Sequence, residues 1–163
     1  MKKFLPIFLL SLLLACQQKT SSTYDGKVVR IADGDTFTML TPDNQQVRVR
    51  LHGIDCPEKA QPFGTVARQK LSDLVFGKQV RLEEQDKDRY GRTVAIVYNE
   101  AGVCVNEEML KEGLAWHYKE YDKNPDWEAL EKEARQQKKG LWSKSRPTPP
   151  WAWRKAKRTE ATP

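Results

Sequence analysis

The segment 47–58 constrains the fold more than any other part of the chain, because it begins with a regular alternation and ends in a break. It reads V-R-V-R-L-H-G-I-D-C-P-E, and apolar residues alternate with cationic or polar ones over the first six positions. This period of two is typical of a half-buried strand, with Arg50 on the open face. A glycine then loosens the strand, and Pro57 ends its ladder because proline has no N–H to donate. An arginine and two carboxylates, Asp55 and Glu58, are therefore expected to converge where a sheet ends.

The N-terminal residues have the pattern of a processing segment. Lys2 and Lys3 precede the apolar run Phe4–Leu14, which is too short to span a bilayer as a helix. The run ends in L-L-A-C, which resembles the lipobox of bacterial lipoproteins, so Cys16 is expected to receive a lipid and to become the first mature residue. The alternative is an ordinary secretory signal with an incidental cysteine. In either case we expect export. A lipid-anchored protein would be held in the cell envelope, at the outer membrane or the periplasmic face, and an unanchored protein would be secreted.

The remaining 148 residues are enough for one domain with a sizeable core, and no internal repeat or second domain is evident. We expect a signal peptide at 1–15, a polar tether at 16–23, the domain at 24–143 and a tail rich in Pro, Trp and basic residues at 144–163. Loss of the signal peptide lowers the formal charge from +6 to +4. This surplus favours a polyanionic partner, either nucleic acid or anionic lipid. Cys56 and Cys104 could form a disulfide in an oxidising compartment, but we favour two free thiols.

Strand and helix patterns follow one another through the domain. Strands are expected at 28–31, 36–40, 47–51, 80–82 and 93–97, and helices at 63–75, at 106–112 with Asn106 as cap, and from Asn124 to Gly140 with Pro125 in the first turn. This order is that of an α+β, mainly β fold, a five-stranded Greek-key barrel of the oligonucleotide-binding type with about three helices.

Four motifs carry the polar residues on which a function can be built. They are Asp33-Gly-Asp35-Thr36, Arg50 with Asp55-Cys-Pro-Glu58, Asp88-Arg-Tyr-Gly-Arg92, and Gly113-Leu-Ala-Trp116 followed by tyrosines. Together and in this order they resemble the staphylococcal nuclease-like (thermonuclease) family, over about Tyr24 to Trp142. The resemblance implies the barrel, three helices and a calcium-dependent phosphodiesterase that acts as an endonuclease on DNA and RNA and leaves 3′-phosphate ends.

The metal site is expected at two aspartates. Asp35 and Asp55 offer the hard oxygen ligands that Ca²⁺ prefers. The resemblance adds the main-chain carbonyl of Cys56 and implies a single Ca²⁺ ion. A thiol in place of the threonine found in the best-known family member leaves the backbone ligand intact, although it introduces a soft group nearby. Without Asp55 alongside, the Asp33-Gly-Asp35 motif would be read as a simple turn.

The resemblance also assigns the catalytic roles. Glu58 corresponds to the general base that activates water, and Arg50 and Arg92 correspond to the pair that grips the reacting phosphate. Planar guanidinium groups suit two phosphoryl oxygens at once and stay charged at any working pH. Taken alone, Glu58 could instead cap the helix that begins near Gln61, and either arginine could simply be solvated.

Further residues are candidates for holding the substrate. Arg89 and Tyr90 correspond to positions that contact the neighbouring phosphate. Tyr118 and Tyr121 lie where a family tyrosine stacks on a base, and the sequence does not decide between them. Alternatively, these tyrosines edge the core before the last helix. His52 and His117 are left outside the predicted mechanism.

The tail interleaves aromatic and basic side chains. Its cations could touch nucleic acid or anionic lipid headgroups. We favour packing of Trp151 and Trp153 onto the domain, as in bacterial relatives with similar tails, and disorder beyond Lys155.

Two other functions compete with a lipid-anchored nuclease. One is a non-catalytic nucleic-acid-binding lipoprotein that kept the barrel, and the other is an envelope lipoprotein with a structural role. Neither explains why Asp35, Arg50, Asp55, Glu58 and Arg92 are all present. We expect DNA and RNA as substrates, the membrane as a partner through the lipid on Cys16, no protein partner, and a monomer.

Overall fold

The computed structural model describes residues 23–160 of the chain. The predicted signal peptide, the lipidation site Cys16 and the tether as far as residue 22 lie outside the described residues. Between residues 23 and 160, no helix combines the length and the apolar composition needed to cross a membrane.

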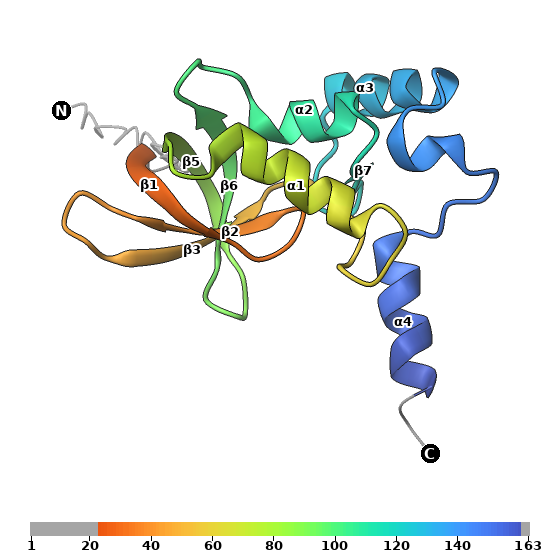
Figure 1. The fold of residues 1–163 in the computed structure, drawn as a ribbon, viewed down its shortest axis with the longest axis horizontal. Helices are drawn as coiled ribbons and strands as arrows, with labels where there is room; N and C mark the ends of the chain where they lie inside the picture. Colours follow the sequence, from red (N-terminus) through yellow and green to blue (C-terminus); the bar gives the residue numbers. More distant parts are fainter. Residues whose placement is uncertain (1–22, 161–163) are drawn as a thin grey trace, which may run out of the picture.

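Five strands close into a barrel (Figure 1). They are β1 (Thr23–Ile31), β2 (Thr36–Leu40), β3 (Gln46–Leu51), β5 (Gln79–Lys87) and β6 (Thr93–Asn99), and they are joined in the order β1-β2-β3-β6-β5. β1 runs antiparallel to both β2 and β5, whereas β3 and β6 run parallel. The predicted five-stranded Greek-key barrel is confirmed.

Helices lie against one end of the barrel. They are α1 (Gly64–Val75), α2 (Val105–Lys111) and α3 (Pro125–Gln136), and α2 packs against both of the others (Figure 1). Two short strands, β4 (Ile54–Asp55) and β7 (Trp116–His117), pair in antiparallel fashion, and β7 contacts α3. After the 3₁₀ turn η1 (Gly140–Ser143), a fourth helix, α4 (Pro150–Glu160), projects from the body of the molecule.

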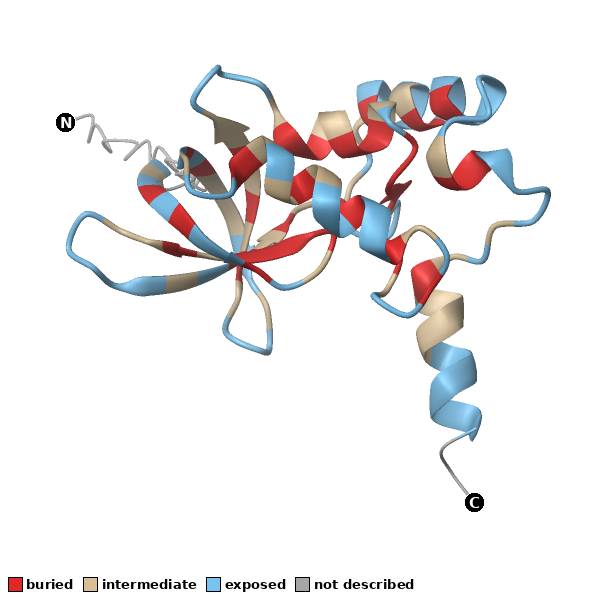
Figure 2. Cartoon of the chain, in the orientation of Figure 1, coloured by how far each residue is buried: buried red, intermediate tan, exposed pale blue. Residues whose placement is uncertain are grey.

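The core forms where the barrel interior meets the helices. Its largest fully buried side chains come from the strands and from α1 and α2, and include Phe37, Met39, Leu51, Leu71, Leu82 and Met109. In Figure 2 the buried residues run along the inner faces of α1 and α2, while α4 is exposed over its outer half. The alternation read from segment 47–51 is visible here, because Val49 and Leu51 are buried and Arg48 is exposed.

One of the two predicted helix caps is confirmed and the other is wrong. Asn124 caps α3, since its side-chain oxygen accepts a hydrogen bond from the N–H of Asp126 at 2.9 Å. Asn106 lies inside α2, and Cys104 takes the cap position instead. The Asn106 side chain accepts a hydrogen bond from the N–H of Val97 at 3.0 Å and donates one to the carbonyl of His52 at 2.9 Å. It therefore joins α2 to the barrel, a tertiary role that a local pattern does not reveal.

The prediction of disorder beyond Lys155 is wrong, because α4 continues to Glu160. Pro150 occupies its first position, where the fixed φ of proline suits a helix and its missing N–H costs nothing. Trp151 packs onto the domain as predicted, with its ring 5.5 Å from that of Trp116. Trp153 lies beneath Lys157 of the same helix, whose Nζ is 5.4 Å from the ring centre. α3 is also shorter than expected, since it ends at Gln136.

Gly53 makes the turn that leads from β3 to β4 and the site beyond. Its φ is +66°, and a Cβ at this position would lie 2.7 Å from the Cβ of Asp122 and 2.8 Å from the ring of Trp127. Both the backbone conformation and the lack of space therefore require glycine.

We predict that Gly53→Ala lowers the free energy of unfolding by about 2–4 kcal/mol in urea denaturation, since backbone strain of about 1–2 kcal/mol is joined by a clash with Trp127. Gly102→Ala is the matched control, because Gly102 also has a positive φ (+74°) but no atom would lie within 4 Å of the added Cβ. Equal losses in the two variants would show that packing around Gly53 is unimportant.

Candidate active site

Arg50 is the centre of the site. It lies on β3 opposite Thr36 of β2 and Val94 of β6, and its side chain is 18% exposed. Nη1 donates to Oδ1 of Asp35 at 2.7 Å, and Nη2 donates to Oδ1 of Asp55 at 2.8 Å. One guanidinium group therefore holds two aspartates that are 20 positions apart in sequence.

The turn before β2 places Asp35 in contact with Cys56, the residue that follows β4. The side chain of Asp33 accepts a hydrogen bond from the N–H of Asp35 at 3.2 Å. A Cβ on Gly34 would lie 2.8 Å from the Cβ of Cys56, so glycine allows the close approach. The N–H of Cys56 in turn donates to Oδ2 of Asp35 at 3.0 Å. Both oxygens of Asp35 are thus fixed.

Burial raises the pKa of each of the three aspartates, and neighbouring charges oppose this shift at Asp35 and Asp55 but add to it at Asp33. Burial raises the pKa of Asp35, but the charge of Arg50 and the N–H of Cys56 outweigh it and hold this pKa below its ordinary value. Burial, followed by the negative charge of Asp35, raises the pKa of Asp33 to about 7. Burial also raises the pKa of Asp55, even though Arg154 and Arg50 oppose the shift. The site therefore holds carboxylates in an environment that favours any further positive charge.

Glu58 and Asp55 share a hydrogen-bonding partner, Arg154, which the sequence did not predict. Nη1 of Arg154, from α4, donates to Oε1 of Glu58 at 2.8 Å and to Oδ1 of Asp55 at 3.2 Å. Nη2 of Arg154 donates to Oδ2 of Asp55 at 2.8 Å. The signal for this residue was present: a helix starting at Pro150 places Trp151 and Arg154, three positions apart, on one face.

Arg92 reaches the site from the loop between β5 and β6. Its Nε donates to Oδ2 of Asp88 at 2.7 Å, which leaves Nη1 3.4 Å from the hydroxyl oxygen of Thr36. That hydroxyl donates to Oδ1 of Asp35 at 3.0 Å. Arg92 therefore lies on the Asp35 side of the site. Asp35, Arg50, Asp55, Glu58 and Arg92 are all brought into one network.

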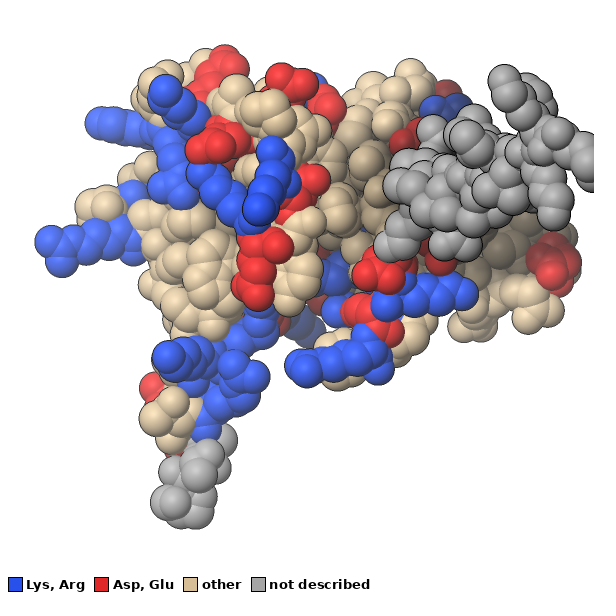
Figure 3. Space-filling view, turned by 180° about the vertical axis from the view of Figure 1, so that it is seen from behind, with Lys and Arg blue, Asp and Glu red and all other residues tan. Residues whose placement is uncertain are grey.

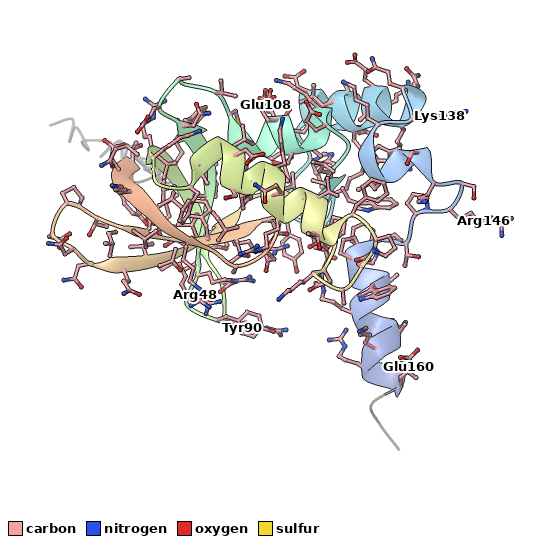
Figure 4. All side chains as sticks on the ribbon, viewed as in Figure 1. Arg48, Tyr90, Glu108, Lys138, Arg146 and Glu160 are labelled. Carbon is pink, nitrogen blue, oxygen red and sulfur yellow. The ribbon has the colours of Figure 1, made fainter. Side chains whose placement is uncertain are left out.

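Arg89 and Tyr90 form the tip of the same loop, which Figure 4 marks with the Tyr90 label. Nη2 of Arg89 donates to the hydroxyl of Tyr90 at 2.8 Å, and Tyr90 is 64% exposed. Arg92 lies 5.6 Å from the centre of the Tyr90 ring. The loop thus presents an exposed aromatic ring and a cation next to Arg92, where a neighbouring phosphate could be bound.

The two candidate tyrosines differ in exposure. Tyr118 is stacked on Trp151 of α4, with ring centres 5.1 Å apart and planes inclined by 11°. Tyr121 meets the edge of Tyr118 and is 64% exposed. Tyr118 lines a pocket of about 560 Å³ together with Trp116, Lys119, Lys132 and Trp151. Tyr121 therefore offers the more open ring for a base, and the choice between them stays a prediction.

His52 and His117 lie outside the network and hold a different carboxylate. Nε2 of His117 is 2.8 Å from Oδ1 of Asp122, and Nε2 of His52 is 3.3 Å from Oδ2. Both rings also pack near Trp127. These contacts join the turn after β3 to the segment before α3, which is a structural role.

The donor atoms at Asp35, Asp55 and Cys56 suit a hard cation. The Cys56 thiol is buried and donates to the carbonyl of Gly34 at 3.2 Å, and burial raises its pKa well above the ordinary value, so it stays neutral. A thiol binds soft metals only as the thiolate, so the neutral Cys56 side chain does not compete with the carboxylate and carbonyl oxygens that suit Ca²⁺. Among residues 23–160, however, no three or more His, Cys, Asp or Glu side chains are arranged to hold a metal ion. Both oxygens of Asp55 are occupied by guanidinium groups. Cys56 and Cys104 are free thiols.

Comparisons with known proteins agree on one family. Residues 48–144 match the family model described as staphylococcal nuclease homologue, a range that contains Arg50, Asp55, Glu58 and Arg92. A Haemophilus influenzae protein named as an uncharacterized endonuclease is 42% identical over 149 residues, which cover 91% of this chain and 82% of that protein. A similarly named Escherichia coli protein is 41% identical over 159 residues, covering 96% of this chain and 100% of that protein. A Shigella flexneri micrococcal nuclease is 45% identical over 143 residues, covering 82% of each chain.

The raised pKa of Asp33 predicts a pH-dependent stability. A carboxyl group whose pKa is higher in the folded state binds its proton more tightly there, so stability falls as the pH rises from about 4 to about 7. We expect Asp33→Asn to match the wild type near pH 4 and to be more stable near pH 8, by about 1–3 kcal/mol.

Urea denaturation in chelator at the two pH values measures this difference. Asp25→Asn, at an exposed position on β1, is the control and should show no such change between the two pH values. A constant difference between Asp33→Asn and the wild type would contradict the prediction.

Proposed function

The chain belongs to the staphylococcal nuclease homologue family and is a hydrolytic nuclease, and we propose that it is a Ca²⁺-dependent endonuclease that hydrolyses DNA and RNA and leaves 3′-phosphate ends. The main observation behind this proposal is the fork of Arg50, which gathers Asp35 and Asp55. Glu58 joins this pair through Arg154, and Arg92 joins it through Thr36. A non-catalytic binding module would have no use for this network.

In the proposed mechanism the cation would be held by Asp35, Asp55 and the main-chain carbonyl of Cys56. When bound, Ca²⁺ would supply positive charge to the phosphate as negative charge develops on it. The neutral thiol of Cys56 and the oxygen-only donor set support this choice of metal.

Glu58 acts as the general base. It takes a proton from water, the water oxygen bonds to phosphorus, the bond from phosphorus to the 5′-oxygen breaks, and the leaving 5′-oxygen takes a proton from solvent. The products are a 3′-phosphate on one fragment and a 5′-hydroxyl on the other. Arg50 and Arg92 bind the phosphoryl oxygens, and their charges oppose the negative charge of the transition state. Asp88 orients Arg92 for this role, because it accepts the hydrogen bond of Nε while Nη1 lies near Thr36.

Residues beyond the reacting phosphate hold the strand. Arg89 and Tyr90 bind the neighbouring phosphate from the tip of the β5–β6 loop, and Tyr118 or Tyr121 stacks on a base. Stacking does not depend on base identity, so this arrangement suits substrates of many sequences.

Digestion of DNA and RNA by the purified protein tests the proposed function. We expect cleavage of both polymers with Ca²⁺, loss of at least about 10²-fold in rate with chelator, and recovery when Ca²⁺ is added back. End analysis should find 3′-phosphates. Cleavage that survives thorough chelation would contradict the proposed Ca²⁺ dependence.

We predict that Glu58→Gln lowers kcat by about 10²–10⁴-fold, because an amide cannot accept the proton from water. The fold and the affinity for DNA should be retained, since the amide oxygen can still accept a hydrogen bond from Arg154. Single-turnover cleavage and filter binding measure the two effects. Glu133→Gln, on the surface of α3, is the control. An equal loss of DNA binding and cleavage would remove Glu58 from the role of base.

We also propose that the protein is exported and anchored in the cell envelope by a lipid on Cys16. The apolar run that ends in L-L-A-C supports this proposal. The intact mass of the mature protein tests it, because a lipidated N-terminus at Cys16 is heavier than a secreted chain. An unmodified Cys16 in the mature protein would contradict it.

A further inference from the structure

Arg154 pairs with two carboxylates to which the proposed mechanism gives separate roles, Asp55 as a metal ligand and Glu58 as the general base. Its fork makes three hydrogen bonds to these two carboxylates, at distances of 2.8–3.2 Å. Asp55 is fully buried, and its oxygens accept hydrogen bonds only from Arg50 and Arg154 among the described residues. An incoming metal ion therefore finds no free oxygen on Asp55 unless a guanidinium group withdraws.

Of the two arginines, Arg154 is the one that can withdraw. Arg50 lies within the barrel on β3 and is 18% exposed, and it also holds Asp35. Arg154 is 37% exposed and is attached to a helix that projects from the body. A long side chain at the surface can swing into solvent without disturbing a strand.

The first turn of α4 is fastened to the domain, so that the side chain can move while the helix stays. Pro150 is buried, and Trp151 stacks on Tyr118. Gln61 ties the approach to α4 to the Glu58 loop, because its amide donates to the carbonyl of Thr148 and its oxygen accepts the N–H of Glu58 at 3.1 Å. Arg154 is thereby held opposite Asp55 and Glu58.

The other basic residues of α4 do not share this placement. Figure 3 shows basic side chains gathered over the projecting helix, and its sequence places Lys155, Lys157 and Arg158 there. Lys155 is exposed and has no recorded contact with a carboxylate in the described part of the chain. Lys155 therefore provides a matched comparison, with the same charge on the same helix but outside the site.

We propose that Arg154 is a resident cation of the active site, which pairs with Asp55 and Glu58 in the metal-free protein and is displaced when a divalent cation binds. This inference rests on the Ca²⁺ dependence proposed above. Arg154 and the metal compete for Asp55, and displacement also releases Glu58 from its ion pair. The general base thus becomes available together with the metal. Without metal, Arg154 stabilises the buried charge of Asp55, for which an uncompensated state would be costly.

Calorimetric titration with Ca²⁺ tests the competition without measuring activity. Arg154→Ala should bind Ca²⁺ about tenfold more tightly than the wild type, a common size for the coupling between two binding events. Arg154→Lys should fall between them, because an ammonium group cannot bridge two carboxylates as a fork does. Lys155→Ala removes the same charge from the same helix and should change the affinity by less than about twofold, because exposed charges are strongly screened by salt.

Thermal unfolding gives a second readout. In chelator, Arg154→Ala should melt at a lower temperature than the wild type, and saturating Ca²⁺ should raise its melting temperature by more than that of the wild type. If the alanine variant fails to fold without metal, Arg154→Lys supplies the same comparison.

The outcomes separate the two proposals. Equal or weaker Ca²⁺ binding by Arg154→Ala, with wild-type binding intact, would overturn the competition and leave the proposed function standing. Equal affinity combined with reduced turnover would instead make Arg154 a phosphate-binding residue. Absence of Ca²⁺ binding in the wild type and in every variant would overturn both the proposed metal dependence and the displacement.

Discussion

The two-pronged bond of Arg50 to Asp35 and Asp55 is the interaction on which the rest of the site depends. Two buried carboxylates repel one another, and burial alone raises the pKa of each. A guanidinium group between them compensates this repulsion and fixes their spacing, which a flexible ammonium could not do. The two aspartates also have different further partners. Arg154 contacts Asp55, whereas Arg92 reaches Asp35 through Thr36. Removing this single fork would leave Asp35 and Asp55 without a common partner.

The barrel supplies the scaffold that this fork needs. Register across β2, β3 and β6 places Thr36, Arg50 and Val94 in one row, and Arg92 enters the site just before that row. The parallel pairing of β3 with β6 begins at Val49 and Thr93, and Arg92, just before this pairing, reaches Thr36. Small residues complete the assembly: Gly34 lets the first turn touch Cys56, and the φ of Gly53 turns the chain toward Asp55. The same few segments therefore supply both the polar side chains of the site and the backbone turns that bring them together.

Sequence reasoning reached the parts of the site that are encoded locally or by familiar motifs. The alternation before Gly53 predicted β3 and the open-face Arg50, and the break at Pro57 predicted the position of Asp55 and Glu58. Arg154 escaped because its contact with Asp55 spans 99 positions and depends on the tail folding back. Asn106 was misread for a related reason, since a polar residue before a helix suggests a cap, whereas the N–H of Val97 competes for the same oxygen. Local sequence patterns do not predict hydrogen bonds between different elements of the fold.

Barrel closure has a consequence for how and when this enzyme becomes active. β1 is the first strand to be synthesised, yet it pairs with β5. The barrel can close only after Glu83, the partner of Thr23, has been synthesised. Pairings between such distant segments are slow to form, because the intervening chain loses much conformational freedom before any contact rewards it. The proposed catalytic and metal-binding residues extend from Asp35 to Arg92, so a chain that ends before β6 has no assembled active centre. A growing polypeptide therefore cannot cut the nucleic acids around it until β5 and β6 are available to close the barrel.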